Sequence, residues 1–128
     1  MSPDCYPLGE FYTPQRKATE FFFLTYKHQL DRARRLILPE ARDGFPWERL
    51  AHLQTHPSTE GVYLVDPGVY YEGSYAGFED VFSVPLNCSI RGEGKADPVV
   101  LGRQHLYLVE RGGEWRVIDI SPLEPGEL

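Results

Sequence analysis

An α+β domain is the fold class that this sequence predicts, with two helices first and an antiparallel sheet after them. Apolar residues recur at helical spacing before Pro57. Beyond Pro57 the hydrophobic period changes to two, and turn signals separate short runs rich in Val, Ile and Tyr. Because helices and strands come in separate blocks rather than in alternation, we expect an α+β fold and not a parallel α/β sheet.

The chain has 128 residues, a length that suits a single domain. We divide it into an irregular lead-in (1–12), a helical part (13–57), a sheet (60–121) and a tail (122–128). The sheet is expected to be curved and to contain about four to six strands.

A long N-terminal helix is the first expected element. Thr13 can cap its free N–H groups, and Pro14 suits the first helical position. Pro39 ends it. Between these residues one apolar stripe runs along the helix, made of Ala18, Phe22, Tyr26, Leu30, Ala33 and Ile37.

A second, shorter helix is expected after the turn at residues 43–46. Trp47, Leu50 and Leu53 recur at three-residue spacing on one face, and Pro57 stops the helix. Two short neighbouring helices of this kind usually pack as a corner.

The sheet is expected to begin with a small hairpin. Residues 62–65 and 69–71 are β-branched and aromatic, and Asp66-Pro67-Gly68 between them is a turn signal. Residues 73–77 contain two glycines and are interpreted as a flexible bend. Residues 81–91 then alternate as a half-buried strand, in which Pro85 indicates either an edge position or a bulge.

The closing hairpin is the clearest β signal, because Gly112-Gly113 separates two long runs, 99–110 and 114–120. Pairing Arg111 with Glu114 sets Glu110 opposite Trp115, Val109 opposite Arg116 and Leu108 opposite Val117. The same register then sets Tyr107 opposite Ile118, Leu106 opposite Asp119 and His105 opposite Ile120. Both faces carry large apolar side chains, so helices should cover one face, and a partner subunit or the lead-in the other.

The charge and composition of the chain argue against some classes of binding partner. The net charge is −6, which disfavours nucleic acid and anionic membranes. Arg32, Arg34 and Arg35 are interpreted as a solvated helix face, with a contact to an anion or nucleic acid as the alternative. No apolar run is long enough to span a bilayer and no signal peptide is visible, so we expect a soluble, cytoplasmic protein. The sequence leaves open whether a leader was removed, and the redox state of Cys5 and Cys88.

Residues 106–120 (LYLVERGGEWRVIDI) resemble the last hairpin of the nuclear-transport-factor-like superfamily. Its members include ketosteroid isomerase, scytalone dehydratase and polyketide cyclases. The resemblance implies a cone in which a bent sheet wraps a long N-terminal helix and encloses a pocket. It covers the C-terminal third and, more loosely, the first helix; residues 57–81 depart from it because they show no third helix. The superfamily contains enzymes and noncatalytic domains, so the fold does not select a function.

Three residues are candidates for catalysis inside such a pocket. Asp119 would share an apolar face with Leu106, Leu108, Trp115 and Val117, where burial shifts a carboxyl pKa toward neutral; the alternative is a solvated strand end. Tyr26 lies on the helical stripe, and the resemblance implies that such a hydroxyl donates to an oxyanion; the alternative is a core residue. His105 could transfer protons or simply be a packed histidine. The full isomerase motif is not matched, since Asp43 precedes the second helix.

Other side chains suggest binding rather than catalysis. Tyr70, Tyr71, Tyr75 and Trp115 could line a pocket or an interface, because Tyr and Trp combine apolar area with a hydrogen bond. Glu48, His52 and His56 lie at one-turn spacing, but Pro57 follows directly, so we expect a surface helix and no metal. No cofactor motif is found.

We therefore favour a noncatalytic domain that binds a small apolar ligand or a protein partner, with a homodimer through the sheet as the expected assembly. The first alternative is a small pocket enzyme of the isomerase, dehydratase or cyclase type. The second is an acidic protein-binding inhibitor or immunity-type protein, for which the net charge is the support. The substrate, ligand and biological partner cannot be derived from the sequence.

Overall fold

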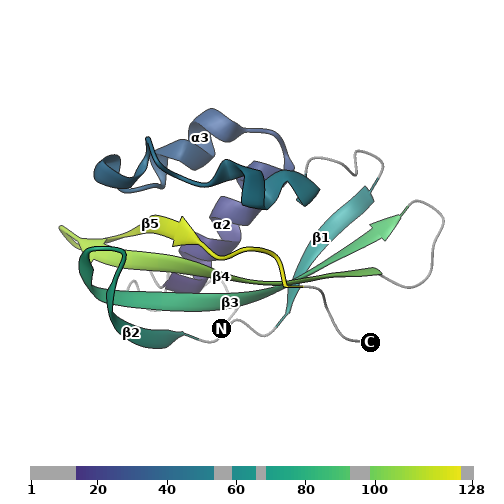
Figure 1. Ribbon diagram of the computed structural model, residues 1–128. Coiled ribbons are helices and arrows are strands. Elements are labelled where there is room, and N and C mark those ends of the chain that lie inside the picture. The colour runs from purple at the N-terminus through teal and green to yellow at the C-terminus, as the bar shows by residue number, and fades with distance from the viewer. Residues whose placement is uncertain (1–13, 54–58, 66–68, 93–98, 125–128) are drawn as a thin grey trace, which may run out of the picture.

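The fold is α+β, with helices packed on one open antiparallel sheet (Figure 1). This computed structural model describes residues 14–53, 59–65, 69–92 and 99–124. The helical elements and the strands follow in that order along the chain: α2 (Pro14–Tyr26), α3 (Leu30–Arg35), the 3₁₀ helices η1 (Pro39–Ala41) and η2 (Trp47–Leu53), then β1 (Thr59–Val65), β2 (Tyr70–Tyr75), β3 (Phe78–Gly92), β4 (Val99–Arg111) and β5 (Glu114–Ile120). The strand order is β1-β3-β4-β5, and β2 also pairs with β3.

The predicted single helix from Thr13 to Pro39 is wrong, because the chain breaks into α2 and α3. His28 adopts a left-handed φ of 60°, and the Gln29 N–H donates back to the Leu24 carbonyl (2.9 Å). An unbroken helix of this length would run straight for about 37 Å. The break instead brings residues 36–38 against β5. There the Val117 N–H donates to the Leu36 carbonyl (2.9 Å), and the Leu38 N–H donates to the Val117 carbonyl (2.8 Å).

The helical stripe mostly reaches the core as predicted. Ala18, Phe22, Ala33 and Ile37 are buried, whereas Tyr26 is half-buried and Leu30 is exposed, because Leu30 follows the break. The space between the helices and the sheet is occupied by one apolar cluster. Its fully buried members include Phe21, Phe22, Ile37, Leu50, Val84, Leu106, Leu108, Val117 and Ile120.

The second helix is present as the 3₁₀ helix η2, with Leu50 buried on its inner face. Trp47 stacks on Phe21 at 5.9 Å between ring centroids and meets Phe45 edge-to-face at 5.0 Å. These ring contacts attach the η2 segment to α2. The end of the predicted helix at Pro57 lies outside the described residues.

β1 and β2 do not form the predicted hairpin with each other. Both pair antiparallel with the 15-residue β3, β1 along residues 87–92 and β2 along residues 78–83. The turn signal at 66–68 lies outside the described residues. The tight turn that does form is Ala76-Gly77, inside the stretch that was interpreted as a flexible bend, and it joins β2 directly to β3.

Pro85 lies in the sheet interior rather than on an edge strand, since β3 has neighbours on both sides. Its partner across β4 is His105, whose own N–H and C=O both bond to Ser121. The Pro85 nitrogen therefore points away from β4. On that side Pro85 falls between Ser83, the last partner of β2, and Asn87, the first partner of β1. Neither β1 nor β2 pairs with Pro85 on that side, so its lack of an N–H removes no hydrogen bond between strands.

We predict that Ala76→Asn stabilises the protein by about 0.5–1 kcal/mol. Ala76 and Gly77 have φ values of 54° and 85°, as a type I′ turn requires, and alanine is a poor residue for the first position. Urea unfolding would measure the gain. Ala76→Val should have the opposite effect, because a β-branched side chain resists positive φ. An Asn variant no more stable than the parent would contradict this interpretation.

The β4–β5 register is as predicted only at its turn end. Arg111, Glu110, Val109 and Leu108 pair with residues 114–117 as expected. The register then shifts, so that Tyr107 pairs with Asp119 and Leu106 with Ile120. The predicted partners Ile118, Asp119 and Ile120 for residues 107, 106 and 105 are therefore wrong. A β-bulge at Ile118 inserts one extra residue into β5.

Both faces of the hairpin are buried, as its apolar pattern predicts. The face away from the helices carries its own cluster of Leu38, Val81, Val109 and Ile118. Tyr75, Phe78 and Tyr107 pack against it. The second face is thus covered in part by the chain itself, through the β2–β3 turn and the segment after α3.

Candidate functional site

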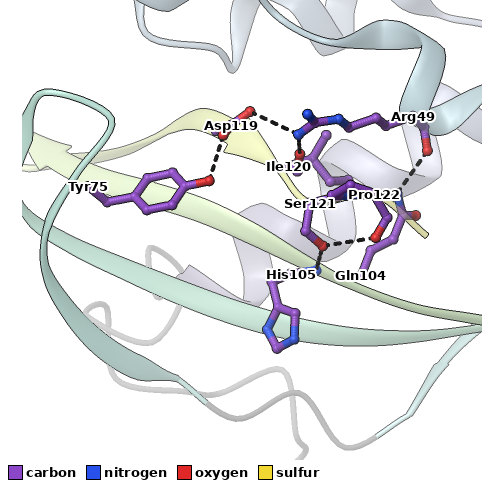
Figure 2. Close-up of polar contacts among 8 residues, drawn as sticks. All are labelled: Arg49, Tyr75, Gln104, His105, Asp119, Ile120, Ser121 and Pro122. Carbon is purple, nitrogen blue, oxygen red and sulfur yellow. Dashed lines mark hydrogen bonds and ion pairs between the residues drawn. The ribbon is translucent and has the colours of Figure 1, made fainter. Parts of the chain in front are cut away.

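Asp119 does not lie on the apolar helix-side face where it was predicted. The bulge at Ile118 moves it to the opposite face, beside Tyr107. There the Tyr75 hydroxyl donates to Asp119 Oδ2 at 2.7 Å, and Arg49 Nη1 lies 3.9 Å from Oδ1 (Figure 2). The carboxylate is therefore engaged on both oxygens. We call Tyr75, Tyr107, Asp119 and Arg49 the tyrosine latch.

Arg49 connects the latch to the helical layer. It projects from η2, and its Nη1 donates to the Ile120 carbonyl at 2.6 Å. Its own carbonyl accepts from Gln104 Nε2 at 2.8 Å, so η2 is bonded to both β4 and β5 (Figure 2). Gln104 is fully buried and its Oε1 has no hydrogen-bond partner. Neither residue was singled out from the sequence, because an isolated Arg or Gln belongs to no recognisable motif.

Tyr75 and Tyr107 are stacked, with centroids 4.0 Å apart and planes 11° from parallel. Burial, followed by the hydrogen bond to Asp119, raises the pKa of Tyr75 well above its usual value. Burial also raises the pKa of Tyr107. The Tyr75 hydroxyl is thus held protonated as a donor to a carboxylate that it already contacts. This arrangement fastens the β2–β3 turn to β5.

The three catalytic candidates are not brought together. His105 lies on the same sheet face as Tyr107, but its ring points away from Asp119 and its backbone is bonded to Ser121 (Figure 2). Tyr26 belongs to α2, which packs on the other face, and the Lys27 ammonium lies 5.5 Å from its ring centroid. The pocket predicted to contain these residues would need them on one side of the sheet.

Breaking the latch is expected to lower stability and to change its pH dependence. Tyr75→Phe removes a hydrogen bond to a carboxylate and should cost about 1–2 kcal/mol at pH 7. Because the folded-state pKa of Tyr75 is raised, its contribution is complete below about pH 10 and is lost as the pH rises further.

Chemical unfolding at pH 7 and at a series of pH values above about 10 would measure both effects. The Phe variant should lose less stability than the parent over the alkaline range. Tyr70→Phe is the control, because Tyr70 is exposed and should leave both quantities unchanged. If the free energy of unfolding fell equally with rising pH in the parent and in Tyr75→Phe, the role given to the Tyr75 hydroxyl would be contradicted.

The remaining aromatic candidates flank the β2 edge of the sheet: Tyr70 pairs with Ser83 and lies on the same face as Tyr107, whereas Tyr71 pairs with Phe82 and lies on the helix-side face. Tyr70 and Tyr71 are consecutive on β2 and are 55% and 62% exposed. Tyr71 meets Phe82 edge-to-face at 5.1 Å, and Phe82 meets Trp115 at 5.3 Å. Trp115 in turn packs on the core. We call Tyr70, Tyr71, Phe82 and Trp115 the β2 surface; Tyr75, which was predicted to belong with them, belongs to the latch.

Metal and membrane candidates find no further support in the part of the chain that the structure describes. No group of three or more His, Cys, Asp or Glu side chains there is placed to hold a metal ion. The side chains of His52 and His56 lie outside the described residues. No helix in the described ranges combines the length and apolar character needed to cross a bilayer.

Comparison of the chain with family models, with curated proteins and with solved structures finds no match.

Proposed function

We propose that this chain is a noncatalytic domain that binds a protein partner through the β2 surface. The observation that carries the proposal is the exposure of Tyr70 and Tyr71 next to each other on β2. Large aromatic side chains that remain exposed on a folded domain are typical of binding surfaces. The Tyr71 ring contacts Phe82, Phe82 contacts Trp115, and Trp115 packs on the core. The exposed Tyr71 ring is therefore connected to the core by a continuous row of aromatic contacts.

A protein partner is favoured over a small apolar ligand because of how the interior is packed. Phe21, Phe22, Leu106 and Leu108 are each at most 1% exposed and belong to one cluster between α2 and the sheet. Side chains that pack on one another leave their apolar area unavailable to a ligand. In the described residues the large aromatic side chains that remain exposed are Phe23 on α2 and Tyr70 and Tyr71 on β2, and only the two tyrosines adjoin each other.

The enzyme alternative has less support, since Tyr26 lies on the opposite side of the sheet from Asp119 and His105, and the His105 ring points away from Asp119 (Figure 2). Membership of the nuclear-transport-factor-like superfamily remains part of the proposal. It is supported by the order of two helices before the sheet and by the closing hairpin with its Gly-Gly turn. We also propose a cytoplasmic location, for which the net charge of −6 favours solubility.

Site-specific photocrosslinking tests the proposed function. A benzophenone amino acid is placed at position 70 or 71, and the protein is irradiated in the cells that produce it. The matched control is position 23, because Phe23 on α2 is 56% exposed and is also aromatic. We expect a discrete crosslinked protein from positions 70 and 71 that position 23 does not give.

Two results would contradict the proposal. Equal crosslinking from all three positions would mean that any exposed aromatic residue captures neighbours. No crosslink from 70 or 71 would mean that the β2 surface is unoccupied in the cell. A crosslink between two copies of this chain would identify the partner as the homodimer predicted from the sequence.

A further inference from the structure

Three carboxylates surround the exposed tyrosines of β2, and each is held in place. Tyr71 Oη donates to Asp80 Oδ1 at 2.8 Å, Ser83 Oγ donates to Glu72 Oε2 at 2.7 Å, and Ser74 Oγ donates to Glu79 Oε2 at 2.8 Å. All three acidic residues are exposed. None of the ion pairs found in the described residues involves them. Their negative charge is therefore directed at solvent around the aromatic surface.

The edge of β2 adds a backbone element to this surface. Within the described ranges β2 pairs with β3 and with no other strand. Tyr70 and Tyr71 are neighbours in sequence, so their side chains leave opposite faces of the sheet and flank the free edge. A strand laid along that edge would contact Tyr70 on one face and Tyr71 on the other. Addition of an extended peptide to an exposed sheet edge is a recurrent recognition mode.

We propose that the partner presents an extended segment rich in Lys and Arg, which adds along β2 at Tyr70 and Tyr71. This inference rests on the proposed function and names the chemistry of the partner. The carboxylates of Glu72, Glu79 and Asp80 would attract the cationic side chains, and the exposed tyrosine rings would accept them in cation–π contacts. Register shifts after Tyr71 and after Gly73 limit the regular edge to its first residues.

Charge favours a cationic segment over a second copy of the chain as the occupant of the β2 edge. Two copies paired through β2 would bring the three carboxylates of one against those of the other. Like charges opposite each other across paired strands are destabilising. The net charge of −6 adds a long-range repulsion between copies. A cationic segment gains from the same charges.

Selection of peptides from a random displayed library tests the inference. The full chain is the bait, with a Tyr70→Ser/Tyr71→Ser variant as the counter-selection. We expect peptides that require the two tyrosines and that carry a net positive charge. The synthetic peptide enriched most would then be titrated against the protein at low and at physiological salt, where raising the salt should weaken binding.

A charge-neutral variant isolates the acidic residues. Glu72→Gln/Glu79→Gln/Asp80→Asn removes three negative charges, from −6 to −3, and leaves an acceptor oxygen for each hydroxyl. The control, Glu20→Gln/Asp31→Asn/Glu48→Gln, makes the same change in net charge at exposed helical positions. We expect the first variant to weaken binding of the selected peptide about tenfold, and the control to weaken it much less.

The outcomes separate the two proposals. Tyrosine-dependent peptides without net positive charge, or equal weakening by both variants, would overturn the cationic segment and leave the protein-binding function standing. Enrichment that does not depend on the tyrosines would overturn both. Concentration-dependent dimers in sedimentation that Tyr70→Ser/Tyr71→Ser abolishes would make a second copy the occupant and would also overturn the cationic segment.

Discussion

Replacing Phe21 by alanine is expected to lower the free energy of unfolding by about 3–5 kcal/mol. Phe21 is 0% exposed and lies where α2, the η2 segment and the sheet meet. Its ring contacts three others: Phe22 at 6.4 Å, Phe45 at 5.6 Å and Trp47 at 5.9 Å between centroids. Truncation removes both the buried area and these aromatic contacts, and the rigid sheet below cannot collapse to fill the space.

Phe23→Ala provides the matched control, since Phe23 is two residues further along the same helix and 56% exposed. We expect a change within about 0.5 kcal/mol there. Urea unfolding monitored through Trp47 and Trp115 fluorescence would measure both variants. If the two replacements cost the same, then the side of α2 that faces the sheet has been assigned wrongly.

The second large effect is expected at Gly102 in β4. Its φ of +151° is rarely adopted by residues with a side chain, and a Cβ built there would clash with the carbonyl oxygen of Glu124. The Glu124 carbonyl accepts a hydrogen bond from the Arg103 N–H at 2.8 Å, and the Glu124 N–H donates to the Arg103 carbonyl at 2.9 Å. Gly102→Ala should therefore displace residue 124 from β4 and destabilise the protein by about 2–4 kcal/mol.

Two measurements distinguish this result from a general loss of packing. Chemical unfolding gives the stability, and hydrogen exchange should show that the Arg103 amide loses protection before its neighbours in β4 do. Gly44→Ala is the control, because a Cβ there meets no atom within 4 Å. An Arg103 amide that stays protected in Gly102→Ala would contradict the clash.

Local patterns were sufficient to predict the fold class and most of the core. The helical stripe correctly placed Ala18, Phe22, Ala33 and Ile37, because burial on one helix face follows the 3.6-residue period. The break at His28 was not predicted, since it depends on what residues 36–38 gain by pairing with β5. Long-range backbone pairing leaves no signal in a local window. The pairing of β1 and β2 with β3 was missed for the same reason.

Asp119 shows why the candidate site was harder to predict than the fold. Strict alternation assigned it to the helix-side face, but both faces of this hairpin are apolar, so the pattern does not detect a shift of one residue. The bulge at Ile118 makes that shift and turns the carboxylate toward Tyr75. Composition predicted that Tyr70 and Tyr71 line a pocket or an interface, and both are exposed on β2, which pairs with β3 alone in the described residues.

The short parallel bridge between Ile37 and Val117 has a consequence for how copies of this protein can associate. It occupies the outer edge of β5 at the middle of the strand, so the sheet is capped on that side by its own chain. An open fibre of stacked sheets needs two free edges on every molecule, one to receive a strand and one to offer. In the described residues β1 and β2 both lie on the opposite side and pair with β3 alone, so a molecule capped at β5 could accept a further strand there but could not extend the sheet from the middle of β5.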